Sequence, residues 1–281
     1  MRPSRASGRD AGQGSAPEAF ALDLDLSLLV LLALCAFGAG LIDAVVGGGG
    51  LIQVPALFTA LPQQSPATLF GTNKLAAIAG TSMAVRTYLS RVRVEWAVLG
   101  PAFLCTLVGA WFGARTVAWL PRDAVRPIVL VALVLVAVYT LRRKGLGDIH
   151  APLHSLAGRR ALAGLAGLGI GFYDGFLGPG TGTFFIFCFV RLLGYDFLSA
   201  SACAKVLNWA SNFAALAFFV PAGHVIWPLA LTMAAANMAG GWIGSRAAIA
   251  RGSPFVRRVF IGVLVLTIGR FGWDTLRPWL G

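Results

Sequence analysis

The sequence predicts an all-α, polytopic membrane protein. Of its 281 residues, 57% are hydrophobic and only 12% are charged, whereas about 25% are charged in ordinary soluble domains. The hydrophobic residues form long runs such as 28–46, 94–114 and 128–141, and about 20 such residues cross a bilayer as a helix. These runs do not alternate apolar and polar positions as membrane-barrel strands do, so helices are expected.

The positive charge lies mainly in the short loops between these runs. The chain has 23 Lys and Arg against 11 Asp and Glu, which gives a formal net charge of +12. In a membrane protein, such loop charges orient the spans and attract anionic lipid headgroups. The lipid bilayer, and not nucleic acid, is therefore the expected partner of the basic residues.

The N-terminal residues are expected to be disordered, and the cysteines are expected to be small packing residues. Residues 1–26, of which the first 22 are rich in Arg, Ser, Gly and Pro, are expected to form a disordered tail without a cleavable signal peptide. The four cysteines lie in apolar runs without C-x-x-C spacing, and the three histidines lie in loops without metal-ligand spacing. We therefore expect no metal site, disulfide framework or cofactor.

The chain matches itself without gaps at a shift of 131 residues. Lys74 then falls on Lys205. Trp96 falls on Trp227 at the same shift. Such coincidences of rare residue types indicate two copies of one unit. The expected organisation is a first repeat at 27–141, a basic linker at 142–160 and a second repeat at 161–281, all within one transmembrane domain.

Each repeat contains four long apolar runs and one short run, at 51–62 or 182–193. A 12-residue helix is only about 18 Å long, so the short run is either a broken or re-entrant helix or a span that borrows its flanks. Eight spans would make the repeats parallel, whereas ten would make them inverted. The loop charges favour ten, with the linker cytoplasmic, both termini outside, and loops 63–66 and 221–224 both periplasmic.

Glycine clusters interrupt the helical hydrophobic pattern at the same place in both repeats. Broken helices at matching positions are typical of transporter binding sites. A helix that restarts after the break presents unpaired N–H groups and a positive dipole end, which favour an anion. The alternative is a tight turn at the membrane face without a ligand. The candidate binding residues at the two breaks are Gly47, Gly49, Gly50, Gly178, Gly180 and Thr181.

Lys74 and Lys205 stand inside apolar helical runs. A lysine within the bilayer costs at least ~2.5 kcal/mol on insertion scales, so each should face the bundle interior and have a partner. Three polar residues share a helical face with Lys205, namely Ser201, Asn208 and Asn212, because spacings of three and four stack on one face. The first repeat lacks most of this stripe, so the two half-sites should contribute unequally to substrate binding.

Asp43 and Asp174, on the spans that lead into the glycines, are the expected counter-charges. One hypothesis is that the two aspartates and two lysines pair only to stabilise the fold. The other is that an anionic substrate competes for the lysines while a released aspartate takes up a proton or cation. Under the second hypothesis, the aspartates are coupling residues.

These motifs resemble those of the sulfite exporter TauE/SafE family. The resemblance rests on GLIDAVVGGGG at 40–50 and FGTNK at 70–74, and on GFYDGFLGPGTG at 171–182 and ACAKVLN at 202–208. The second repeat's stretch is similar to YfcA-type members. The resemblance implies a multi-pass permease of the cell inner membrane for small anions, typically sulfite, sulfonates or other organosulfur compounds. It also implies that the matching glycines and lysines are site residues.

The predicted function is secondary transport of a small anion, without enzymatic activity. The sequence has no Walker-type loop that would bind ATP. The two alternatives are a passive anion channel and an intramembrane enzyme. A small anionic substrate and the lipid bilayer are the expected partners, with the oligomeric state left open.

Overall fold

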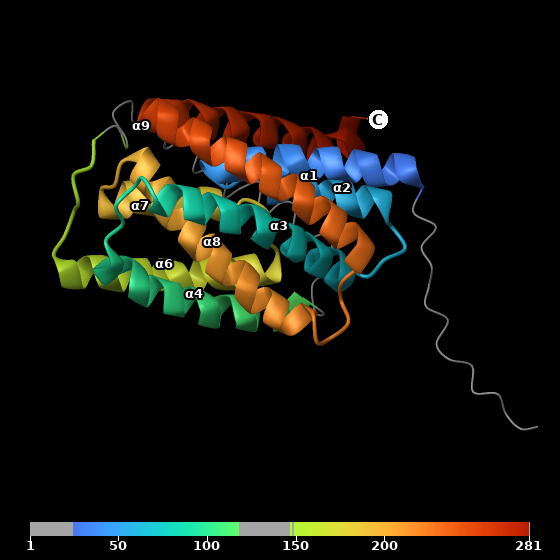
Figure 1. Ribbon diagram of the computed structural model, residues 1–281, viewed down its shortest axis with the longest axis horizontal. Coiled ribbons are helices and arrows are strands. Elements are labelled where there is room, and N and C mark those ends of the chain that lie inside the picture. The colour runs from blue at the N-terminus through green and yellow to red at the C-terminus, as the bar shows by residue number, and fades with distance from the viewer. Residues whose placement is uncertain (1–24, 118–146, 148, 281) are drawn as a thin grey trace, which may run out of the picture.

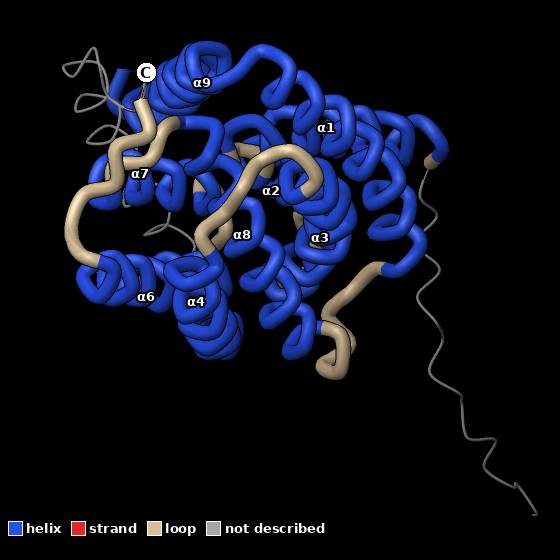
Figure 2. Tube along the Cα trace, turned by 60° about the vertical axis from the view of Figure 1, so that its left-hand side comes forward, coloured by secondary structure: helices blue, strands red, loops and turns tan. Residues whose placement is uncertain are grey.

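A computed structural model describes residues 25–117, 147 and 149–280 of the chain. These residues form helices joined by loops, and no strand occurs among them (Figure 2). The all-α prediction is therefore confirmed. The apolar run 128–141, nearly all of the expected tail and the first part of the expected linker lie outside the described residues.

The helices follow one another in the order shown in Figure 1. They are α1 (Leu26–Val46), α2 (Gly50–Ala60), α3 (Pro66–Leu89), α4 (Trp96–Thr116), α6 (Leu156–Phe176), α7 (Thr181–Leu193), α8 (Phe197–Phe219) and α9 (Trp227–Leu280). Helix α9 consists of two arms joined at Gly252, which has a non-helical φ of 69°. Helix α6 begins inside the segment expected as a linker, so the end of that segment is helical.

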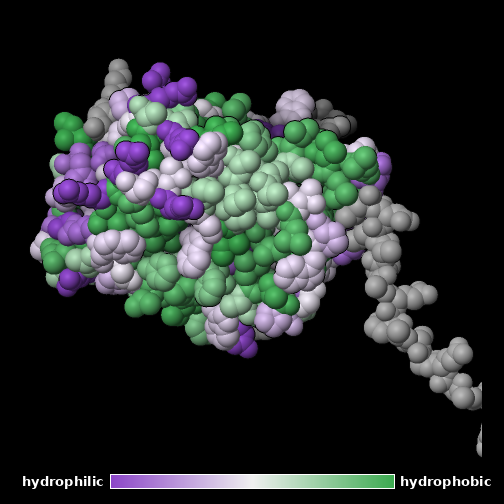
Figure 3. Space-filling view, viewed as in Figure 1, coloured by the Kyte–Doolittle hydropathy of each residue, from purple (hydrophilic) through white to green (hydrophobic). Residues whose placement is uncertain are grey.

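Three of the described helices are long and apolar enough to cross a membrane: α1, α4 and α9 over Trp227–Arg270. Helices α3, α6 and α8 have 24, 21 and 23 residues, but they are not among these three. Helices α3 and α8 are less apolar because they carry the buried lysines and amides described below. Among the described residues, the strongly apolar helices are thus α1 and α4 in the first repeat and α9 in the second. Figure 3 shows a broad hydrophobic face, with hydrophilic residues gathered at its left end.

The loops divide between two opposite ends of the helical bundle (Figure 1). At one end, the loop before α9 contacts the first turns of α3, since the Ile226 N–H donates to Thr72 Oγ1 at 3.0 Å. At the other end, the segment before α6 lies on the connection between α7 and α8, since the Ala151 N–H donates to the Gly194 carbonyl at 2.9 Å. Arg159 of α6 also pairs there with Glu95, the residue before α4.

The short helices run back along the helices that precede them. Leu28 and Leu29, in the first turn of α1, pack in the same cluster as Leu57 and Leu61 at the end of α2. The chain leaving α2 therefore returns to the end of the bundle at which α1 begins. Helix α7 likewise ends beside the start of α6, since the Leu153 N–H donates to the carbonyl of Leu193 at 2.8 Å. The two glycine breaks are thus the tips of two helical hairpins.

Glycines let helices from the two halves of the chain pack backbone to backbone. A Cβ at Gly109 of α4 would lie 2.2 Å from the carbonyl oxygen of Leu168 in α6. A Cβ at Gly240 of α9 would lie 2.1 Å from the carbonyl oxygen of Phe37 in α1. At the shift of 131 residues, Gly109 matches Gly240 and Phe37 matches Leu168. The two contacts are therefore equivalent, with the two halves of the chain exchanged. Close packing through small residues stabilises helix pairs in lipid.

Asp196 fixes the start of α8, the helix that carries Lys205. Its carboxylate accepts hydrogen bonds from the N–H groups of Leu198 and Ser199 and from the hydroxyl of Ser253 on α9. Burial alone would raise the pKa of Asp196, but the hydrogen bonds from Ser199 and Ser253 outweigh it and hold this pKa below its usual value. The ionised carboxylate is therefore a stable N-cap.

Candidate functional site

The two glycine breaks touch each other inside the bundle. Gly47 ends α1 in the left-handed conformation, with φ of 78°. A Cβ on Gly47 would lie 2.3 Å from backbone atoms of Gly182, and a Cβ on Gly182 would lie 2.4 Å from the Cα of Gly47. Only glycine permits so close an approach. The Thr183 hydroxyl donates to the Val46 carbonyl at 3.0 Å, which ties the two breaks together.

Each break holds the aspartate of its own hairpin. Asp43 Oδ1 accepts a hydrogen bond from the Gly49 N–H at 3.3 Å. Asp174 Oδ1 accepts one from the Thr181 hydroxyl at 2.8 Å. In both hairpins, one carboxylate oxygen is thus used by the restarting helix, and the second oxygen is left for another partner.

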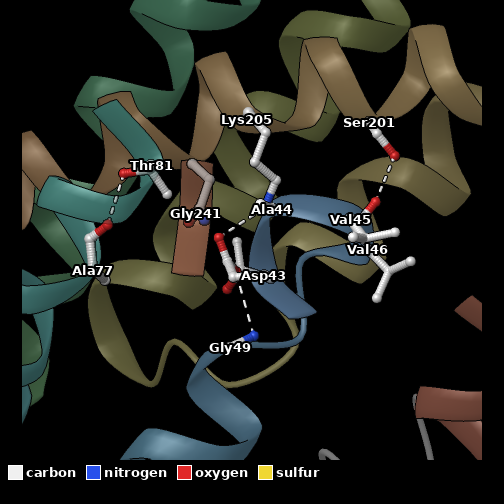
Figure 4. A network of polar contacts seen from close by, with 12 residues as sticks. Asp43, Ala44, Val45, Val46, Gly49, Ala77, Thr81, Ser201, Lys205 and Gly241 are labelled. Atoms are coloured by element: carbon white, nitrogen blue, oxygen red, sulfur yellow. Dashed lines mark hydrogen bonds and ion pairs between the residues drawn. The ribbon is translucent and has the colours of Figure 1, made fainter. Parts of the chain in front are cut away.

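The second oxygen of each aspartate contacts a lysine from the other half of the chain. Lys205 Nζ of α8 lies 2.8 Å from Asp43 Oδ2 of α1 (Figure 4). Lys74 Nζ of α3 lies 2.7 Å from Asp174 Oδ2 of α6. The two ion pairs are therefore crossed between the repeats, and each break has a lysine contributed by the opposite repeat. The partners predicted for the lysines are the ones observed, although the sequence did not indicate this crossing.

Both ion pairs are shielded from solvent, but not equally. The side chains of Lys74 and Asp174 are each 3% exposed, and that of Lys205 is fully buried. Asp43 is more accessible, at 15%. Moving two charges out of water has a high desolvation cost, and their mutual attraction offsets only part of this cost. The site is therefore closed around its charges in this conformation, with Asp43 as its most exposed member.

The other predicted site residues are hydroxyls, amides and glycines. Two hydroxyls donate to the protein itself: that of Ser201 to the Val45 carbonyl at 3.0 Å (Figure 4) and that of Thr181 to Asp174. The Asn212 side-chain amide is buried, and its Nδ2 has no hydrogen-bond partner among the described residues. Asn208 is buried on the same helix face. The remaining glycines, Gly50, Gly178 and Gly180, line the two breaks, where Gly178 and Gly180 have positive φ.

Three buried amides were not predicted. Asn73, beside Lys74, is 5% exposed and its Oδ1 has no partner among the described residues. Gln53 of α2 and Asn237 of α9 are also buried and bond to each other at 3.1 Å. An amide within an apolar helical run is a signal of interior placement. None of the three lies on the polar stripe of Ser201, Lys205, Asn208 and Asn212, which was the signal for the predicted amides.

Comparison with known proteins identifies the family. A family model described as sulfite exporter TauE/SafE matches residues 32–271. The chain belongs to the TauE/SafE family. This match includes both hairpins and both crossed ion pairs.

Curated relatives in this family are named as membrane transporters. A probable membrane transporter protein ORF9 from Sinorhizobium sp is 36% identical, with 92% of this chain and 99% of that protein covered. The probable membrane transporter protein YfcA of Escherichia coli K12 is 34% identical, with 90% and 94% covered. A Haemophilus influenzae probable membrane transporter protein is 30% identical, with 90% and 98% covered. No solved structure matches the chain significantly. These names indicate a membrane transporter and not an enzyme.

Proposed function

We propose that this TauE/SafE-family protein is a multi-pass secondary transporter of a small anion in the cell inner membrane. Sulfite, a sulfonate or another organosulfur anion is the proposed substrate class, in line with the family description as a sulfite exporter. The observation that carries the proposal is the pair of crossed Lys–Asp contacts at two touching helix breaks. Broken helices and paired intramembrane charges are both features of ion and substrate sites in transporters.

The ion pairs give a mechanism for exchanging an anion with a carboxylate. A small anion that enters between the breaks competes with Asp43 or Asp174 for a lysine ammonium. The released carboxylate then takes up a proton or a cation, because an unpaired charge is strongly disfavoured in a site of low dielectric constant. The buried Asn212 Nδ2, which has no partner among the described residues, adds a hydrogen-bond donor for the anion. Binding of the anion is thereby coupled to uptake of a positive charge.

The two repeats are proposed to be inverted relative to each other. The equivalent hairpins support this, because α1 begins and α2 ends at one end of the bundle, whereas α6 begins and α7 ends at the opposite end (Figure 1). An inverted arrangement permits alternating access, in which one half moves against the other around a fixed site.

Cysteine labelling tests this topology. In a variant without the four native cysteines, we expect Gln63→Cys and Ala222→Cys to react with a membrane-impermeant maleimide in intact cells. We expect Ala151→Cys, on the segment before α6, to react only after permeabilisation. Position 222 is preferred to its neighbour Gly223, because Gly223 has φ of 73° and a cysteine would be strained in that conformation. Labelling of only one of positions 63 and 222 from outside would contradict the inverted arrangement.

A binding screen tests the substrate class. The purified protein is heated with sulfite, thiosulfate, sulfoacetate, taurine or plain carboxylates, and the unfolding temperature is measured. A ligand that binds the native state raises this temperature in a concentration-dependent way. We expect the small sulfur oxyanions or sulfonates to give the largest shift. An equal shift with every anion, which indicates a general salt effect, would contradict the proposed class.

A further inference from the structure

An apolar groove opens on the side of the bundle between α3, α4 and α8, separate from the ion pairs. Figure 1 shows α8 passing between α3 and α4. The groove has a volume of about 790 Å³. Its walls include Val85 and Leu89 of α3, Trp96 and Phe103 of α4, and Val206 and Trp209 of α8. The described residues that line the groove are apolar or aromatic. The groove therefore suits a hydrocarbon ligand.

The dimensions of the groove match one lipid chain. Along α4 it extends from Trp96 to Leu104, which is about 12 Å at a rise of 1.5 Å per residue. This length is close to half of a hydrocarbon core about 30 Å thick. At Gly100 a Cβ would have no atom within 4 Å, so the absence of a side chain keeps the middle of the groove open.

The mouth of the groove is cationic. The loop 90–95 joins Leu89 to Trp96, two of the lining residues, and carries the exposed Arg91 and Arg93. No carboxylate of the described residues lies within ion-pair distance of these two arginines. Trp96 is 56% exposed, and tryptophan favours the level of the lipid headgroups. The two arginines could thus contact an acidic headgroup while the adjacent groove holds an acyl chain.

We infer that this groove, bounded by α3, α4 and α8, binds an anionic phospholipid. One acyl chain lies in the groove, and the phosphate faces Arg91 and Arg93. Basic pockets next to membrane helices recognise anionic headgroups in this way. The inference does not depend on the identity of the transported anion.

The groove also borders the helix that carries the site. Val206 and Trp209 follow Lys205 and Asn208 directly in α8. Trp209 is fixed by a hydrogen bond from its Nε1 to Ser82 Oγ at 2.8 Å and by stacking on Phe103. A bound lipid chain therefore packs against the back of α8 and stabilises the position of its lysine.

Native mass spectrometry and thermal unfolding test the inference without any transported substrate. Delipidated protein is titrated with phosphatidylglycerol or phosphatidylcholine of the same chain composition. We expect phosphatidylglycerol to bind more tightly than phosphatidylcholine. It should also raise the unfolding temperature by more. Gly100→Trp, which fills the groove, should abolish this binding, whereas Gly169→Trp, at another helical glycine with open space around its Cβ, should not.

A second variant separates headgroup from chain. Replacing Arg91 and Arg93 together by Gln should weaken phosphatidylglycerol binding roughly tenfold or more and leave phosphatidylcholine binding unchanged, because each basic residue near a lipid surface contributes about 1 kcal/mol. Arg258→Gln, at an exposed arginine outside the groove, is the matched control. Unaltered phosphatidylglycerol binding by Gly100→Trp would overturn the inference. A second outcome would also overturn it: the parent protein is a dimer, and Gly100→Trp converts it to a monomer without changing the bound lipid. The groove would then bind a second copy of the chain.

Discussion

Lys205→Met is expected to destabilise the protein strongly, and Lys205→Met combined with Asp43→Asn is expected to restore its stability but not its transport. The single change leaves Asp43 without its cation, and breaking one side of a buried ion pair costs ~3–5 kcal/mol. In the double variant no charge is left unpaired, and an Asn side-chain oxygen still accepts from the Gly49 N–H. Unfolding temperature and uptake into liposomes measure the two effects separately.

The matched variant in the other half is Lys74→Met with Asp174→Asn. We expect anion affinity to fall by at least about tenfold in the Lys205 double variant, because a charge-assisted hydrogen bond contributes ~1.5–3 kcal/mol. The loss should be smaller in the Lys74 double variant, since Asp43 is more accessible than Asp174 and the Lys205 helix carries the polar stripe. Lys205→Arg should rescue poorly, because a planar guanidinium does not replace a compact ammonium.

Normal transport by both double variants, at normal expression, would contradict the substrate role of the lysines. The ion pairs would then serve only to hold the two halves together. The anion site would move to the backbone N–H groups at the helix breaks.

Gly47→Ala and Gly182→Ala are each expected to prevent the two hairpin tips from meeting. A Cβ at position 47 costs ~1–2 kcal/mol for the left-handed conformation, and overpacking adds ~1–3 kcal/mol. At Gly182 the conformation is helical, so only the contact with the Gly47 backbone is lost. Both variants should show a lower unfolding temperature and little transport, with Gly47→Ala the more damaged.

Gly169→Ala of α6 is the control for these substitutions. Its Cβ would meet no atom within 4 Å, and alanine is favoured over glycine in a helix by about 1 kcal/mol. We expect this variant to be as stable as the parent or slightly more stable, with full transport. If Gly47→Ala behaved like Gly169→Ala, the close contact of the two breaks would not exist in the folded protein.

The sequence predicted the helical class, the membrane context and the positions of both breaks, because these depend on composition and on local patterns. Gly47 and Gly178 were identified as helix-breaking from their neighbours alone, and both have positive φ in the structure. The charge of Lys205 within an apolar run was sufficient to predict that it faces the interior with a partner.

The sequence did not predict which partner each charge has. The contacts Lys205–Asp43 and Lys74–Asp174 join residues from different halves of the chain, and a repeat pattern is the same whether such pairs form within or between repeats. The hydrogen bond that Ser201 donates to Val45 depends on the same tertiary arrangement. Side-chain chemistry therefore identified the residues, whereas their pairing required the packing of α1 and α6 against helices of the opposite half.

The claim that this protein is an anion carrier is tested most directly by counterflow in liposomes. Purified protein is reconstituted in vesicles loaded with unlabelled sulfite, and entry of labelled sulfite is followed; if the screen selects another anion, that anion is used. We predict that internal unlabelled anion accelerates entry of the label in the parent protein, and that this acceleration is lost in the folded Lys205→Met, Asp43→Asn variant. Entry that is equally fast into empty and loaded vesicles, as through a channel, would contradict the account.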